Sequence, residues 1–142
     1  MKAVGEILRK HDGTLWQVPP DITVYAAVEQ LAHYGVGALL VMDGNRLVGV
    51  FSERDYTRKI TLQGRNSKET LVADIMTADV FTVSATTRTR DCMALMSAKK
   101  IRHLPVLDGD RVLGMISIRD IMDDIIADHE STIATLHSYI HS

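Results

Sequence analysis

Three residue types that bind anions and hydroxyl groups recur together at two places in the sequence. The two clusters are Ser52, Arg54 and Asp55, and Ser117, Arg119 and Asp120. In each cluster the carboxylate can accept hydrogen bonds from hydroxyl groups, while the serine and the arginine can bind an anion. A helix beginning at each serine would add free N–H groups and a favourable dipole. The same spacing also fits a helix cap, in which the serine and the acid serve only the backbone.

The two clusters belong to an internal duplication. Residues 39–55 align with residues 104–120 at a constant offset of 65 positions. Many of the aligned pairs are identical, among them both serines, both arginines and both aspartates of the clusters, and most of the other pairs exchange one apolar residue for another. Val18 pairs with Val83, and residues 4–8 resemble residues 72–76 at an offset of 68. The first copy therefore has three extra residues, which we place within residues 11–14. Units this small are expected to bury apolar surface against each other.

The order β-α-β-β-α is predicted twice. A short apolar stretch at 15–18, and again at 80–83, suggests a strand. One apolar helix face follows in each copy, formed by Val24, Ala27, Val28 and Leu31, and by Thr89, Cys92, Met93 and Met96. Two strands then meet at Asp43-Gly44 or Asp108-Gly109, where glycine permits a positive φ. Gly49 and Gly114 interrupt the second of these strands and indicate a bulge or a close backbone approach.

The repeated motifs resemble those of a known family. Gly49-Val-Phe-Ser-Glu-Arg-Asp55, Gly114-Met-Ile-Ser-Ile-Arg-Asp120 and Ile101-Arg-His-Leu-Pro-Val106 resemble a tandem CBS-domain pair, also called a Bateman module. The resemblance implies an α+β fold whose two repeats pack sheet to sheet about a pseudo-twofold axis, with a C-terminal helical extension. We expect CBS domains at 4–62 and 72–128, a linker at 63–71 and a helical tail at 129–142.

The same resemblance implies a ligand between the repeats. The ligands of the family contain adenosine: AMP, ADP, ATP, NAD or S-adenosylmethionine. Asp55 and Asp120 would then bind the ribose hydroxyls, and the serines and arginines the phosphate. Candidate contacts of the adenine are Val18, Ala38, Val83 and Ile116. His103 stands where family members have a basic residue that contacts phosphate, and its protonated form would bind better.

Two alternatives accompany these assignments. His103 could instead be a hydrogen-bonded histidine at the start of a strand. Ala38 takes the equivalent place in the first copy, so the two sites are expected to differ in affinity. A ligand-free structural dimerisation module is the alternative function, because helix capping alone would also explain each Ser-x-x-Asp.

Composition and charge narrow the functional class. The 142 residues are 46% hydrophobic and 24% charged, which suits a soluble globular protein, and the net charge of −2 argues against general nucleic-acid binding. A single cysteine, no signal-peptide core and no long apolar run favour a cytoplasmic protein that does not enter the membrane. We predict no enzyme, because the sequence has no nucleophile–base pair and no phosphate-binding P-loop. The family instead suggests signalling to an unidentified protein partner.

Three other features are expected to have structural roles. Cys92 should be a small core residue, and residues 99–102 a solvated basic helix end. His137 and His141 have the spacing of two metal ligands on a helix, but no Glu or Cys at supporting spacing, so no metal is expected.

The tail differs from the rest of the chain, because it has no counterpart after the first copy. Residues 120–140 are predicted to form one long helix. Its apolar residues are Ile121, Ile125, Ile126, Ile133, Leu136 and Ile140. They indicate packing against a second subunit, and hence a homodimer.

Overall fold

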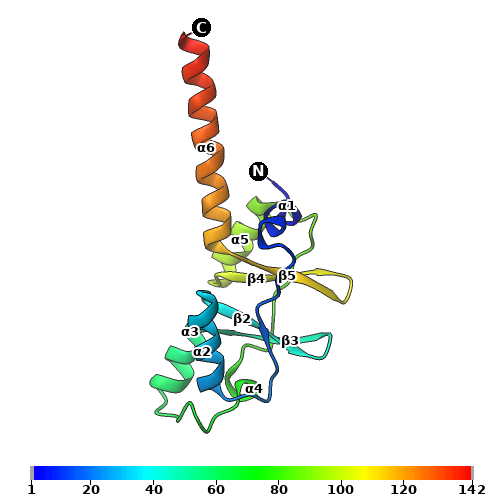
Figure 1. Ribbon diagram of the computed structural model, residues 1–142, viewed down its shortest axis with the longest axis vertical. Coiled ribbons are helices and arrows are strands. Elements are labelled where there is room, and N and C mark those ends of the chain that lie inside the picture. Colours follow the sequence, from blue (N-terminus) through cyan, green and yellow to red (C-terminus); the bar gives the residue numbers. More distant parts are fainter. Residues whose placement is uncertain (1, 142) are drawn as a thin grey trace.

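Two small sheets lie one above the other, and a long helix projects from one end of the molecule (Figure 1). The computed structural model describes residues 2–141, apart from the side chains at 131, 132, 135 and 139–141. The first half contains α1 (Val4–Leu8), η1 (Arg9–His11), β1 (Gln17–Val18), α2 (Val24–Tyr34), β2 (Ala38–Asp43), β3 (Arg46–Ser52), α3 (Glu53–Asp55) and η2, a π-helical segment over Tyr56–Thr61. The second half contains α4 (Val72–Ile75), α5 (Thr89–Lys99), β4 (His103–Asp108), β5 (Arg111–Ser117) and α6 (Ile118–His141).

The first strand of each repeat is present in one copy only. In the first repeat β1 runs parallel to β2, and the Leu40 N–H donates to the Trp16 carbonyl at 2.9 Å. The strand expected at 80–83 is absent, because in the second repeat the position of Leu40 is taken by Pro105, which has no N–H to donate. Val83 makes only an isolated bridge to Val106. That prediction was wrong for the second copy.

The helix faces and hairpins follow the sequence prediction. In α2 the buried residues are Val24, Ala27 and Leu31, and in α5 they are Thr89, Cys92 and Met96. Thr23 caps α2 by accepting a hydrogen bond from the Ala26 N–H at 3.2 Å. Both hairpins turn at a glycine with positive φ, 62° at Gly44 and 59° at Gly109.

The short helices α1 and α4 each pack on the opposite repeat. Val4 and Ile7 of α1 lie in the hydrophobic cluster of the second repeat, whereas Val72 and Ile75 of α4 lie in that of the first. Backbone hydrogen bonds also connect each of these helices to the opposite repeat. The Val4 N–H donates to the carbonyl of Thr87 at 2.8 Å, and the Val72 N–H to that of Ile22 at 2.9 Å. Because residues 22 and 87 are equivalent in the duplication, the exchange obeys the pseudo-twofold symmetry.

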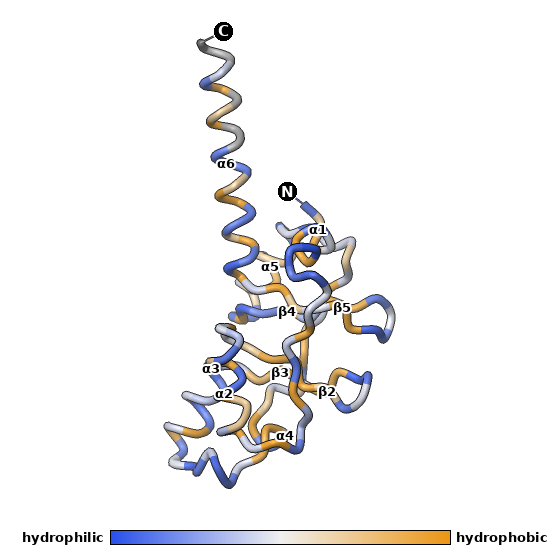
Figure 2. Tube along the Cα trace, viewed as in Figure 1, coloured by the Kyte–Doolittle hydropathy of each residue, from blue (hydrophilic) through white to orange (hydrophobic). Residues whose placement is uncertain are grey.

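A third hydrophobic cluster lies between the two sheets. It is formed by Ala38, Leu40, Met42, Val112 and Met115, all buried, with residues of β2 facing residues of β5. This packing confirms the expected sheet-to-sheet arrangement of an α+β fold. Apolar segments accordingly gather along the strands of the body (Figure 2).

The glycines inside β3 and β5 make room for the exchanged helices. A Cβ on Gly49 would lie 2.7 Å from the Met76 sulfur and 2.9 Å from the Thr77 carbonyl oxygen, and one on Gly114 would lie 3.1 Å from a Leu8 methyl. Each glycine also faces a register shift in its hairpin. The predicted bulge is confirmed at both glycines, and a close approach of backbone is found at Gly49, whereas the neighbour of Gly114 is the Leu8 side chain.

The tail forms one continuous helix, α6. Near its start Ile121 is fully buried, and Asp124, also fully buried, pairs with the Lys2 ammonium at 2.9 Å. Further along, the side chains of Ile126, Ile133 and Leu136 are exposed. The side chains of Tyr139, Ile140 and His141 lie outside the described residues.

We predict that Gly49→Ala destabilises the fold by about 1 to 3 kcal/mol, because the new methyl group would press on the backbone carbonyl of Thr77. Urea unfolding measures the effect. Gly37→Ala is the control, since its Cβ would meet only the His103 ring, at 3.4 Å. Equal stability of Gly49→Ala and wild type would contradict the close-approach argument.

Candidate functional site

Both Ser-x-x-Asp motifs form helix caps. At the start of α3 the Asp55 N–H donates to the Ser52 hydroxyl oxygen at 3.2 Å, and the Ser52 N–H donates back to Oδ2 of Asp55 at 3.0 Å. At the start of α6 the corresponding distances between Asp120 and Ser117 are 3.1 and 2.8 Å. The capping interpretation is therefore confirmed at both places. The cap uses Oδ2 of each carboxylate, and Oδ1 is left for other contacts.

Oδ1 of Asp55 is already occupied. The Thr77 hydroxyl donates to it at 3.0 Å, and the Lys59 ammonium lies 3.3 Å away. Lys59 also donates to the Ile75 carbonyl at 2.9 Å, which holds its charge in place. Asp55 is only 7% exposed. This carboxylate is thus buried, neutralised and hydrogen-bonded on both oxygens.

Oδ1 of Asp120 is far more open. Within residues 2–141 its one polar neighbour is Nε2 of His11 at 3.3 Å, and the side chain of Asp120 is 24% exposed. The position equivalent to Lys59 holds Asp124, a second carboxylate, which pairs with Lys2 instead. No lysine therefore neutralises Asp120 from its own helix.

The neighbour of Asp120 comes from the extra residues of the first copy. His11 ends η1, and its ring stands 5.2 Å from that of Trp16, centroid to centroid, at an interplanar angle of 59°. His11 reaches Asp120 of the second repeat, whereas Trp16 packs against the hydrophobic cluster of the first repeat, so the aromatic pair connects the two repeats. Sequence reasoning missed His11, Lys59 and Thr77. Only the Asp55–Lys59 spacing of four residues gave a signal, since the other two contacts depend on the exchanged helices.

The two arginines also differ. A guanidinium nitrogen of Arg54 donates to the Lys100 carbonyl at 2.7 Å and so joins α3 of the first repeat to the end of α5 in the second. Arg119 is exposed and forms no hydrogen bond or ion pair within the described residues. Of these two arginines, Arg119 is the one whose guanidinium has no hydrogen bond or ion pair among the described residues.

His103 lies between the repeats. Its ring approaches Gly37, at the end of the loop before β2. Charged side chains of both repeats influence it: Arg54 of the first, and Arg102 and Asp120 of the second. Burial lowers the pKa of His103 below its usual value. The charges of Arg102 and Arg54 act in the same direction, and Asp120 opposes them. The imidazole is therefore neutral at pH 7 and would meet an anion as a neutral donor.

The four candidate adenine contacts are mostly enclosed. Val18, Ala38 and Ile116 are at most 4% exposed, each in a different hydrophobic cluster, and Val83 is half-buried against the cluster of the second repeat. Val83 is thus the most accessible of the four, and the ligand contacts of all four stay predictions.

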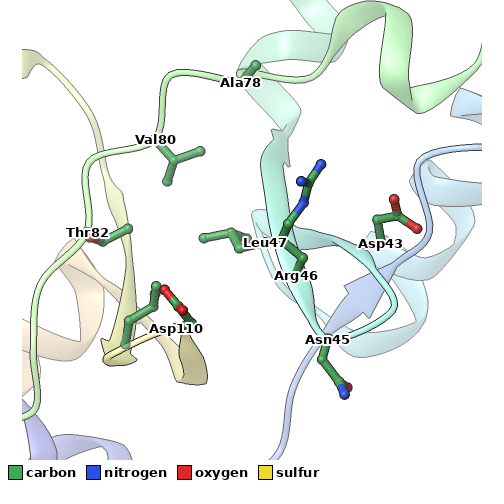
Figure 3. A pocket seen from close by; sticks show the side chains of 9 residues that line it. Asp43, Asn45, Arg46, Leu47, Ala78, Val80, Thr82 and Asp110 are labelled. Atoms are coloured by element: carbon green, nitrogen blue, oxygen red, sulfur yellow. The ribbon is translucent and has the colours of Figure 1, made fainter.

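A cavity of about 630 Å³ opens at the other end of the sheets, between the two hairpins. Leu47 and Val80 point towards each other across it, with Asp110 below (Figure 3). The lining residues are Asp43, Asn45, Arg46, Leu47, Ala78, Val80, Thr82, Leu107 and Asp110. None of them belongs to the Ser-x-Arg-Asp clusters, so this hollow is separate from the candidate site.

Cys92 is fully buried in the second hydrophobic cluster, and burial raises the pKa of its thiol to about 11, which confirms it as a core residue. Among residues 2–141 no three His, Cys, Asp or Glu side chains gather as metal ligands would, although the side chain of His141 lies outside that description. Nor does that part of the chain contain a helix long and apolar enough to cross a bilayer.

Each half of the duplication matches the same protein-family model. The family model described as CBS domain matches residues 4–61 and 72–127. The mitochondrial CBS domain-containing protein CBSX3 of Arabidopsis thaliana is 39% identical over 145 residues, which cover 99% of this chain and 69% of that protein.

Solved structures agree with the sequence match. A protein with CBS domains from Burkholderia ambifaria is 45% identical, with a TM-score of 0.86 over 89% of this chain and 96% of that one. A CBS domain protein from Pyrobaculum aerophilum, complexed with AMP, is 25% identical, with a TM-score of 0.75 over 84% of this chain and 89% of that one.

We predict unequal costs for removing the two carboxylates. Asp55→Ala should destabilise the fold by about 2 to 4 kcal/mol, because it removes a cap and leaves buried donors unpaired. Asp120→Ala should cost about 1 kcal/mol, because it removes a cap and a partly exposed contact with His11. Urea unfolding of both variants checks this, and equal losses would show that Asp55 is no more embedded than Asp120.

We predict that His103 makes the fold less stable in acid. Because its pKa in the folded state lies below the unfolded value near 6.5, protonation favours unfolding, and the contribution is lost as the pH falls below about 6.5. Between about pH 8 and about pH 5.5, wild type should lose more stability than His103→Gln in urea titrations. Parallel losses in the two proteins would refute the assignment.

Proposed function

The chain belongs to the CBS domain family, as a tandem pair of CBS domains, and from that premise we propose that it is a regulatory module that binds an adenosine-containing ligand at the start of α6. The observation that supports the proposal is the difference between the two repeats. Asp120 has an accessible oxygen and no lysine partner, whereas Asp55 is buried against Lys59 and Thr77.

Each part of a nucleotide has a matching group near Asp120. Oδ1 of Asp120 can accept hydrogen bonds from the ribose hydroxyls in place of its contact with His11. The Ser117 hydroxyl, the N-terminal end of the 24-residue helix α6 and the free Arg119 guanidinium favour a phosphate. Val83, which packs against the cluster of the second repeat, and Trp16, which contacts His11 and packs against the cluster of the first repeat, offer apolar surface for the base. AMP, ADP, ATP, NAD and S-adenosylmethionine all carry the required adenosine.

The Asp55 side of the pair is proposed to be the weaker site. A ribose there would have to displace the Thr77 hydroxyl and the Lys59 ammonium from a buried carboxylate. Losing those bonds would offset most of what the ligand could gain. One ligand per chain at the Asp120 side is therefore the proposed stoichiometry.

Ligand binding at this place would act directly on the tail. Asp120 lies in the first turn of α6, and the far end of that helix projects beyond the body (Figure 1). A ligand that binds one orientation of α6 more tightly would shift the population towards it. We propose that the shift is read by a protein partner, and that the module works as a homodimer in a reducing, cytoplasmic setting, consistent with the free, buried Cys92.

A ligand-free dimerisation module is the second candidate. The completed cap at both helix starts favours it, because capping already gives each serine and each aspartate a structural role. The two candidates differ in one measurable respect, the affinity for adenosine ligands.

The test is calorimetric titration of the wild-type protein with AMP, ADP, ATP, NAD and S-adenosylmethionine in turn. We expect one of them to bind once per chain and to raise the melting temperature by mass action. Asp120→Ala should weaken binding at least about tenfold, because hydrogen bonds to a charged acceptor are lost.

Asp108→Ala is the matched control, since Asp108 is an exposed carboxylate at the hairpin of the same repeat. It should leave the affinity unchanged. If the folded wild-type protein binds none of the five ligands at millimolar concentration, the dimerisation module is the better description. Binding that survives Asp120→Ala would place the ligand elsewhere.

A further inference from the structure

The exposed apolar residues of α6 follow a heptad repeat. Met122, Ile126, Ile133 and Leu136 are 52%, 52%, 65% and 59% exposed, and their spacing of four, seven and three residues skips only His129. At about 100° per residue these five side chains fall within an arc of about 80°. Ile140 continues the register in the sequence, though its side chain lies outside the described residues. Hydrophobic positions repeating every 3.5 residues are the mark of a coiled-coil seam.

This seam is distinct from the face that α6 turns to its own body. Ile121 and Asp124 are fully buried, and Ile125 packs against the cluster of the second repeat. On a regular helix these residues centre about 110° away from the seam. A second helix can therefore lie along the seam without displacing the body, and most of the seam lies on the part of α6 that projects from it (Figures 1 and 2).

We propose that two copies of the chain pair through α6 as a parallel, two-stranded coiled coil. Isoleucine fills the a positions, at 126, 133 and 140, while the d positions hold Met122, His129 and Leu136. Isoleucine at a with leucine at d favours two parallel strands. The pairing specifies how the homodimer forms, and it requires no ligand.

Charge favours the parallel orientation. In an antiparallel pair with every seam residue matched, Ile133 of one copy would face His129 of the other, and the two Glu130 carboxylates would meet on the same side. In a parallel pair the two Glu130 side chains lie on opposite sides of the seam. Like charges are then separated, at the cost of placing the two His129 rings together at one d layer.

Sedimentation of the full chain without nucleotide tests the pairing. Wild type should sediment at twice the 15.8 kDa chain mass, and Ile126→Glu with Ile133→Glu should reduce this to one chain. Ala127→Glu with Ala134→Glu is the matched control, because these exposed positions have the same spacing but lie outside the seam. A monomeric wild type, or a seam variant that stays dimeric, would overturn the proposal.

Filling the polar layer gives a test in the opposite direction. His129→Leu should tighten the dimer on the order of tenfold, because it replaces a polar layer with an apolar one. An unchanged or weaker dimer would place His129 outside the seam.

Cross-linking tests the orientation. In a parallel pair Leu136→Cys brings the two new thiols face to face, so mild oxidation should link the copies, while Ser138→Cys, on the outer side, should not link. Cys92 is buried and does not interfere. A dimer whose Leu136→Cys form resists cross-linking would refute the parallel pairing. Because none of these measurements uses a nucleotide, they can fail or succeed independently of the ligand proposal.

Discussion

Neither repeat completes its own hydrophobic core, because each receives a short helix from the other repeat. The rest of the structure depends on this exchange of helices. α1 carries Val4 and Ile7 into the second repeat, and α4 carries Val72 and Ile75 into the first. The strand glycines leave room for the ends of those helices, because Leu8 of α1 lies close to β5 and Met76 and Thr77, which follow α4, lie close to β3. The exchange also decides which side chains surround each helix start. Fold and site therefore depend on the same crossing of the chain.

The duplication is close to symmetric in its backbone and asymmetric in its charges. At the exchanged helices equivalent N–H groups donate to equivalent carbonyls in both halves, and both serine caps contain the same two backbone-to-side-chain hydrogen bonds. The repeats differ in the strand β1, which has no counterpart in the second repeat, in the π-helical segment η2, and in a few side chains. Lys59 neutralises one aspartate, whereas the matching Asp124 leaves the other uncompensated. Both aspartates cap a helix, but the second oxygen of Asp55 is bonded to Thr77 and Lys59, whereas Asp120 is paired with His11 and is more exposed.

Much of this architecture could be predicted from the sequence, because local patterns determine it. The face of α2, the glycine turns and the helix starts at Ser52 and Ser117 all follow from residue types at fixed spacing. The predictions failed or fell short where distant segments meet. The strand at 80–83 is absent because of Pro105, and the contacts of Thr77 and His11 with the two aspartates come from segments that follow the helices exchanged between the repeats. No spacing along the chain encodes such an encounter.

The ion pair of Lys2 with Asp124 ties α6 to the opposite end of the chain. Asp124 is fully buried, and the hydrogen bond and charge of this carboxylate raise the pKa of Lys2. The carbonyl of Lys2 in turn accepts from the Thr89 N–H at the start of α5. A charge enclosed in this way is costly to separate from its counterion. These contacts hold the base of α6, the first residues of the chain and the start of α5 together. A small rotation of this unit would therefore displace the far end of the 24-residue helix α6 by a much larger distance.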